Sequence, residues 1–196
     1  STPPAAAQDH LTAAQVDRFN ALTREGGAII FRYMLLTDRE PAPLNTEEVR
    51  RGIALLDQAI EIYPGHWQTW WVKGKAFQAL GDNRAAFEAF RRAYDIDSRQ
   101  QPTINEMTIA AMEIGEFEFT LGAVRRGLTD FPDDLALRAR LALVLLLTGE
   151  PQQAIEAADR ALAVAPGDGV TMTIRQVAVE VRDGVRPQPR SMADLH

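Results

Sequence analysis

Apolar residues recur every three or four positions along most of the chain, a spacing that places them on one face of an α-helix. Two such stripes stand out between Trp67 and Gln100, and they consist of Trp70, Gly74 and Phe77, then Ala86, Phe90 and Ala93. Gly81 and Asp82 separate the stripes. Because glycine favours a helix end and aspartate favours a helix start, the segment is predicted to be a helical hairpin.

The hairpin pattern returns at an interval of 34 residues, and three columns keep that interval. The columns are Gly81, Gly115 and Gly149; Ala59, Ala93, Gly127 and Ala161; and Pro64, Ser98, Pro132 and Pro166. Small residues allow two helices to approach closely, and proline stops the second helix of each pair. The chain is therefore predicted to stack similar helix pairs, each in contact with its neighbours.

These columns resemble the tetratricopeptide repeat family, over roughly Thr46 to Asp183. The resemblance implies an all-α fold, a right-handed α-solenoid of helix-turn-helix repeats. The repeat domain is expected at 45–183, with the second half of a first repeat at 45–66. Full repeats are expected at 67–100, 101–134 and 135–168, and a C-terminal capping helix at 169–183.

The two ends are expected to depart from the repeat. Residues 1–10 are predicted to be extended, and 11–44 to form divergent N-terminal helices with an insertion. Thr12 and Gln15 make a capping box for a helix to about Arg24, and Gly26-Gly27 is predicted to interrupt it before a second helix over 28–37. The insertion is placed at 38–44, and residues 184–196 are predicted to form an extended tail.

Composition narrows the classes of function. Hydrophobic residues make up 46% of the chain, which argues against disorder, and the net charge of −6 argues against a nucleic-acid partner. No apolar run approaches the roughly 18 residues of a transmembrane helix. The chain has no cysteine, so the compartment stays open: cytoplasmic, or periplasmic if a signal peptide preceded Ser1. Lys73 and Lys75 are the only lysines, and this arginine bias suggests a bacterial source.

Sequence motifs give no support for catalysis. His10, His66 and His196 are isolated, and no metal-binding, phosphate-binding or nucleophile motif is present. The chain is therefore predicted not to be an enzyme, and no cofactor or metal is expected.

In tetratricopeptide proteins the first helices of successive repeats line a concave groove that holds a partner peptide or helix. The positions about 100° round from the packed face map that groove here. They are Trp71, Lys75, Gln78, Asn105, Ile109, Met112, Ala139, Leu143 and Leu146, with Arg140 alongside. Alternatively these residues belong to a core covered by neighbouring helices or the tail, or to a homodimer interface. The tryptophans Trp67, Trp70 and Trp71 also admit a carbohydrate or cation site.

The family resemblance thus predicts a non-enzymatic scaffold or adaptor for protein–protein interaction, with peptide binding in the groove. Two alternatives stay open. The chain resembles small acidic tetratricopeptide chaperones for secreted or exported subunits, and it could instead be a self-associating component of a larger assembly.

Overall fold

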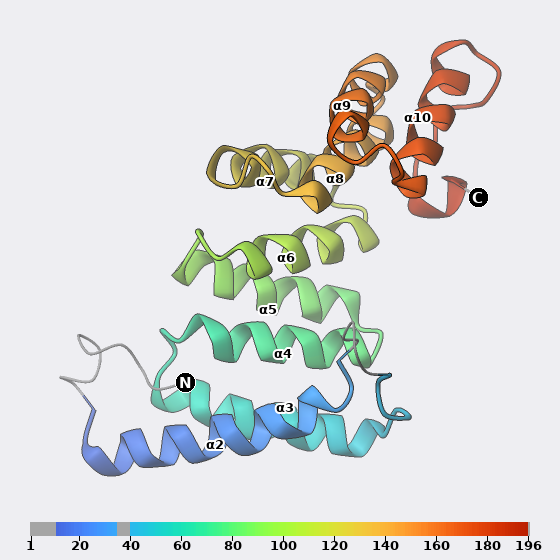
Figure 1. Cartoon of the computed structure of the whole chain (residues 1–196). Helices are drawn as coiled ribbons and strands as arrows, with labels where there is room; N and C mark the ends of the chain where they lie inside the picture. The colour runs from blue at the N-terminus through green and yellow to red at the C-terminus, as the bar shows by residue number, and fades with distance from the viewer. Residues whose placement is uncertain (1–10, 35–39, 196) are drawn as a thin grey trace. The chain divides into compact units, whose positions relative to one another are not determined.

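The computed structural model describes residues 11–34 and 40–195, and this part of the chain is helical without strands. The helices are α2 (Ala13–Phe31), α3 (Thr46–Ile62), α4 (Trp67–Ala79), α5 (Asn83–Ile96), α6 (Gln101–Glu113), α7 (Phe117–Asp130), α8 (Leu135–Leu147), α9 (Pro151–Val164), α10 (Gly169–Arg182) and the 3-10 helix η1 (Met192–Leu195) (Figure 1). They fall into two compact units, residues 1–103 and 104–196. The all-α prediction is confirmed.

The turns between paired helices follow the glycine column. Gly81, Gly115 and Gly149 have φ of +74°, +80° and +83°, a left-handed conformation that glycine adopts without steric cost. Asp82 then begins α5, and its side chain accepts a hydrogen bond from the Ala85 amide. Helix stop and helix start are therefore both encoded locally, as the sequence predicts. Pro64, Pro132 and Pro166 lie in the turns after α3, α7 and α9, also as expected.

In the N-terminal unit, α2 and α3 form an antiparallel pair that crosses at two glycines. A methyl group on Gly26 would lie 3.2 Å from the Gly52 carbonyl oxygen, and one on Gly52 would lie 2.7 Å from a carbon of Ile30. The Thr12–Gln15 capping box is present at the start of α2. A salt bridge of 2.6 Å between Glu25 and Arg51 joins the two helices on their exposed side.

The predicted break at Gly26-Gly27 is wrong, because α2 runs without interruption from Ala13 to Phe31. Gly26 is buried at the crossing, so its missing side chain serves close approach to α3 and not chain reversal. The helix also ends earlier than the predicted Thr37. The predicted extended segment 1–10, residues 35–37 of the predicted second helix and residues 38 and 39 of the predicted insertion lie outside the described residues.

The next pair, α4 and α5, packs a large residue against a small one. Phe90 is fully buried, and a methyl group on Gly74 would lie 2.5 Å from a carbon of its ring. Ala86 and Ala93 are also fully buried on α5. These are the positions that the sequence assigns to the contact between the helices.

The C-terminal unit has its core among α7, α8, α9 and α10. Buried Leu145, Ala158 and Val177 belong to this core cluster, and Leu143 and Leu195 pack against it from the edge. Helix α10 follows α9 at the place predicted for the capping helix. In the described residues, no helix combines the length and apolar character needed to cross a membrane.

After α10 the chain turns at Gly184, whose φ is +73°, and runs back along the same helix (Figure 1). Residues 184–195 are called the tail below. The tail ends in η1, and Pro189 within it is buried. The tail predicted to be extended packs on its own unit: Leu195 lies against the apolar core cluster, and Pro189 is buried.

Candidate functional site

The ten predicted groove residues divide between the two units. Trp71, Lys75 and Gln78 lie on α4 in the N-terminal unit, and the other seven lie on α6 and α8 in the C-terminal unit. Each group is described within its own unit.

On α4, Trp71 is partly buried and packs against the apolar cluster formed by α2 and α3. Its indole nitrogen is buried, and within residues 11–34 and 40–195 it has no hydrogen-bond partner. The Lys75 amine lies 5.8 Å from the centre of the Trp71 ring, within the range of a cation–π contact. Trp71 thus takes part in the core of its unit, as the alternative interpretation of the stripe expects.

A polar network joins α6 to α8 in the C-terminal unit. Arg140 donates hydrogen bonds of 3.0 Å to the Asn105 side-chain oxygen and to the Thr108 hydroxyl. Asn105 in turn donates to the Asp134 carboxylate at 3.0 Å. Burial lowers the pKa of Arg140 from its ordinary value, although the nearby Asp134 and Glu106 carboxylates act in the opposite direction. The network holds the guanidinium in one orientation at the edge of the unit.

The apolar positions of the predicted stripe differ in exposure. Ile109 is 38% exposed, whereas Met112 and Leu146 are 4% and 0% exposed. Ala139 and Leu143 are partly buried. Met112 and Leu146 could touch a partner only after a change in the structure, and the remaining three are open to one as they stand.

A pocket of about 740 Å³ opens in the C-terminal unit and is called the C-terminal pocket. Its walls come from α8, from one face of α10 and from the tail, with the end of α6 at its rim. The lining residues are Glu113, Leu143, Asp168, Gly169, Val170, Thr173, Ile174, Val177, Met192, Ala193 and Leu195. Most of the large side chains in this set are apolar, so the pocket favours a hydrophobic ligand group.

A smaller depression of about 240 Å³ continues the pocket toward the start of α8. It shares four residues with the pocket and adds Ala136, Ala139 and Arg140. Pocket and depression together are called the C-terminal groove. Ala139, Arg140 and Leu143 are the predicted residues that line it, and Asn105, Ile109, Met112 and Leu146 do not.

Helix α10 and the tail contribute pocket residues that the sequence interpretation missed. Val170, Ile174 and Val177 recur at helical spacing, and this stripe was available in the sequence. The repeat pattern predicts only a capping helix here, and capping does not indicate that one side of the helix is open. Met192 and Leu195 carried no comparable signal, since nothing in the sequence shows where the tail folds.

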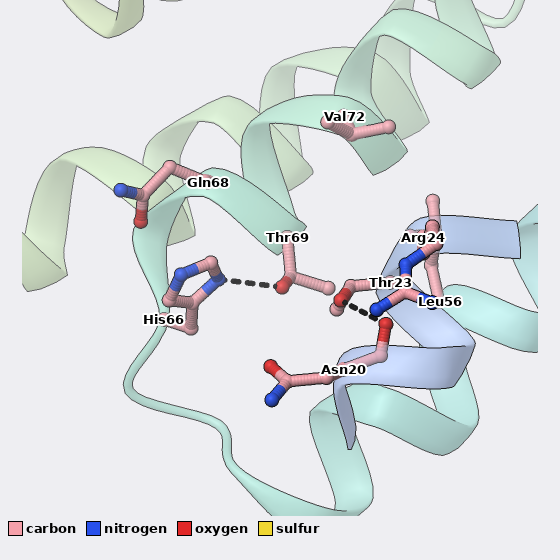
Figure 2. Close-up of a pocket in the computed structure, with 8 residues that line it drawn as sticks. All are labelled: Asn20, Thr23, Arg24, Leu56, His66, Gln68, Thr69 and Val72. Carbon is pink, nitrogen blue, oxygen red and sulfur yellow. Dashed lines mark hydrogen bonds between the residues drawn. The ribbon is translucent and has the colours of Figure 1, made fainter. Parts of the chain in front are cut away.

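The N-terminal unit has a pocket of a different kind, about 270 Å³, between α2 and the start of α4 (Figure 2). It is called the N-terminal pocket, and its lining is Asn20, Thr23, Arg24, Leu56, His66, Gln68, Thr69 and Val72. Figure 2 shows the His66 ring directed at Thr69, where Nδ1 lies 2.8 Å from the hydroxyl oxygen. Most of the lining side chains are polar.

His66 is 3% exposed, and its buried Nε2 atom has no hydrogen-bond partner among the residues that the structure describes. Phe19 packs edge-on against the ring, with ring centres 5.2 Å apart. Burial lowers the pKa of His66 to about 4, because the protonated ring would lose its hydration. The sequence interpretation set His66 aside as isolated, and its neighbours on α2 are too distant in sequence to have signalled it. Within the described residues, no group of histidines and carboxylates is arranged to hold a metal ion.

Comparison with known proteins agrees with the repeat pattern. The profile of the tetratricopeptide repeat family matches residues 44–101 and 109–169. A search of curated protein sequences finds no match.

Among solved structures, a MamA protein aligns with a TM-score of 0.72 at 17% identity, covering 85% of this chain and 84% of that one. YrrB, described as a TPR protein with an unusual peptide-binding site, aligns with a TM-score of 0.66 at 13% identity, covering 93% of this chain and 84% of that one. PilF of Pseudomonas aeruginosa aligns with a TM-score of 0.62 at 18% identity, covering 87% of this chain and 72% of that one.

At these identities the structural likeness concerns the fold alone, whereas the profile covers more than half of the sequence. Paired helices, glycine turns and the matched residues lead to one conclusion: the chain belongs to the tetratricopeptide repeat family.

Proposed function

We propose that this chain is a non-enzymatic adaptor that binds an apolar segment or helix of a protein partner in its C-terminal groove. The tetratricopeptide fold supports protein–protein interaction in general, and one similar structure, YrrB, has a peptide-binding site. The observation that carries the narrower assignment is the C-terminal pocket, which places Leu143, Val170 and Ile174 around one opening.

The size and lining of the groove suit a short run of apolar side chains. Val170 is 66% exposed at its edge, and such a surface gains free energy when it is removed from water. Glu113 and Asp168 line the pocket and add negative charge to a chain whose net charge is already −6, whereas Arg140 lines the depression beside it. A partner segment with apolar side chains and a flanking basic residue fits this distribution.

The groove can be tested by photocrosslinking, because the chain has no cysteine of its own. Labelling the Val170→Cys variant with benzophenone maleimide places the crosslinker in the groove. The Val164→Cys variant, labelled in the same way, is the matched control. Val164 lies on α9, is 57% exposed and lines neither part of the groove. After illumination in a lysate of the source organism, we expect a crosslinked protein from position 170 that is absent from position 164.

A second variant separates binding from folding. Val170→Glu should weaken capture of that protein by about ten-fold or more, because its carboxylate would enter an apolar pocket. Val164→Glu should leave capture unchanged. Both valines are exposed, so each change should move the free energy of unfolding by no more than about 0.5 kcal/mol. Equal capture by both variants would overturn the proposed site.

A further inference from the structure

The tail docks on its own unit beside the C-terminal groove, and its contacts show how this surface binds a chain segment. The Gln188 side-chain amide donates to the Leu146 backbone oxygen at 2.5 Å. Leu146 lies in the last turn of α8, outside the groove lining, and its oxygen also accepts a hydrogen bond from the Gly149 amide at 3.2 Å. Pro189, the residue after Gln188, is buried. An amide donor followed by proline is therefore the first element that docks the tail, at the end of α8 beside the groove.

The second element is the short turn at the end of the tail. The Asp194 carboxylate accepts hydrogen bonds from the amides of Arg190 and Ser191 at 2.8 and 2.9 Å. Arg186 closes the other side, donating to the Asp194 backbone oxygen at 2.8 Å. These hydrogen bonds hold the turn so that Leu195 packs against the apolar core cluster and Met192 lines the pocket.

The tail lies along one side of the groove and forms part of its wall. The side-chain hydrogen bond from Gln188, the buried Pro189 and the apolar contact of Leu195 attach it to the unit. Near Gly184, which permits the reversal, Arg186 adds a salt bridge of 3.8 Å to Glu180 on α10. The open volume of about 740 Å³ lies between η1 and α10. A segment that used the whole groove would meet the tail at its edge.

We propose that the surface on which the tail docks, at the edge of the C-terminal groove, binds partner segments with the chemistry of the tail, and that the tail competes with them. The recognised chemistry is an amide-bearing side chain before proline, followed within about two helical turns by an apolar side chain. This inference rests on the proposed function, since it names the kind of segment that the groove takes and the contact that limits its access. A covalently attached competitor has a high effective concentration, so it can oppose a weak partner without strong contacts.

The test uses a fluorescein-labelled synthetic peptide with the sequence of residues 184–196, and full-length chains. Fluorescence anisotropy compares wild type with the double variant Gln188→Ala and Leu195→Asp, which removes two of the contacts that attach the tail. Val185→Ala is the matched control, because Val185 is a tail residue that is 78% exposed and does not line the pocket. Adding Val170→Glu to the double variant tests whether the peptide enters the groove.

If the attached tail occupies its place in about nine molecules of ten, the peptide should bind the double variant about ten-fold more tightly than wild type. Val185→Ala should behave as wild type, and Val170→Glu should remove the binding that the double variant gains. Equal affinity for wild type and the double variant, or no binding to the double variant, would overturn the proposal.

Hydrogen exchange on the wild-type chain gives a second measurement that needs no variant. The amides of Arg190 and Ser191 should exchange more slowly than in the free peptide, and equal rates would contradict a docked tail. Failure of the proposed function looks different: lysate capture would not respond to Val170→Glu, although the peptide would still prefer the double variant. If the peptide bound wild type and the double variant equally while lysate capture still responded to Val170→Glu, the proposed function would stand and only the competition by the tail would be overturned.

Discussion

The two pockets of this protein are built on the same type of repeat but have opposite character. The N-terminal pocket is lined mainly by polar side chains and includes the buried, neutral His66, whereas the C-terminal pocket is larger and lined mainly by apolar ones. In both, a segment outside the residues matched by the family profile forms part of the wall: α2 in one unit, and α10 with the tail in the other.

This difference teaches where function is encoded in such a chain. The repeat columns fix helices and turns, which are alike in both units, and the segments outside the repeats add to the lining of each pocket: polar side chains of α2 in one, and apolar side chains of α10 and the tail in the other. Packing within the hairpins also differs. The pair Gly74 and Phe90 in the N-terminal unit corresponds, two repeats on, to Ala142 and Ala158 in the C-terminal unit.

The largest effect is expected from substitutions that make the pair Gly74 and Phe90 resemble the pair Ala142 and Ala158. Phe90→Ala should lower the free energy of unfolding by about 3–5 kcal/mol, because it leaves a cavity beside Gly74. Gly74→Ala alone should also destabilise, by about 1–3 kcal/mol, since its methyl group would overlap the Phe90 ring. Urea unfolding followed by tryptophan fluorescence reports this unit, because Trp67, Trp70 and Trp71 all lie on α4.

The double variant distinguishes contact from general damage. With Phe90 removed, Gly74→Ala should stabilise, because the methyl group enters free space and alanine favours a helix over glycine by about 1 kcal/mol. The pair would then match Ala142 and Ala158. If Gly74→Ala destabilised both backgrounds equally, the close approach to Phe90 would not be the reason for the glycine.

The hairpins could be predicted because their signals are local. Gly81 and Asp82 determine a turn through their own backbone and side-chain preferences, and the structure has them as predicted. The break predicted at Gly26 is wrong because this glycine serves the close approach to Gly52 on another helix, a contact that local sequence does not show. The tail was misinterpreted for a similar reason: Gln188 binds a backbone oxygen of α8, and a backbone acceptor leaves no mark in the sequence.

The second prediction concerns the loss of stability at acid pH, which should be larger in the N-terminal unit than in the C-terminal unit. His66 has a pKa of about 4 in the folded chain against about 6.5 when unfolded, so the unfolded chain takes up its proton first as pH falls. The contribution of neutral His66 to the free energy of unfolding is fully present above pH 6.5, and it is lost as the pH falls from 6.5 to 4. From pH 7.5 to 5 the loss should be about 2 kcal/mol. His66→Gln should remove most of this difference in fluorescence-detected unfolding.

The described part of the C-terminal unit contains no histidine, so its helices serve as the internal control. Hydrogen exchange in α9, corrected for the intrinsic effect of pH, should change less than in α4 over the same range. A wild-type chain and a His66→Gln variant with equal acid sensitivity would show that His66 is accessible to protons in the folded state. The polar pocket would then be open, and the contrast between the units would weaken.

The candidate site could be predicted in part. The repeat mapping placed Ala139, Arg140 and Leu143 on one surface, and all three line the C-terminal groove, although partner binding there stays a prediction. The mapping could not give the wall supplied by α10 and the tail, because a repeat pattern describes only the repeats. For the same reason His66 had no visible partner, since Phe19 and Asn20 belong to the divergent helix α2.

The smallest expected effect tests α2, the helix that gives the N-terminal pocket its polar wall. In the described part of the chain, no other atom lies within 4 Å of the place where a side chain on Gly27 would begin, so Gly27→Ala should stabilise the chain by about 0.5–1 kcal/mol if α2 is continuous. Gly26→Ala is the matched control and should gain nothing, because its methyl group would lie 3.2 Å from the Gly52 oxygen. Urea unfolding measures both, and a destabilising Gly27→Ala would mean that the helix breaks there in solution, so that Asn20 and Thr23 would no longer be held rigidly opposite His66.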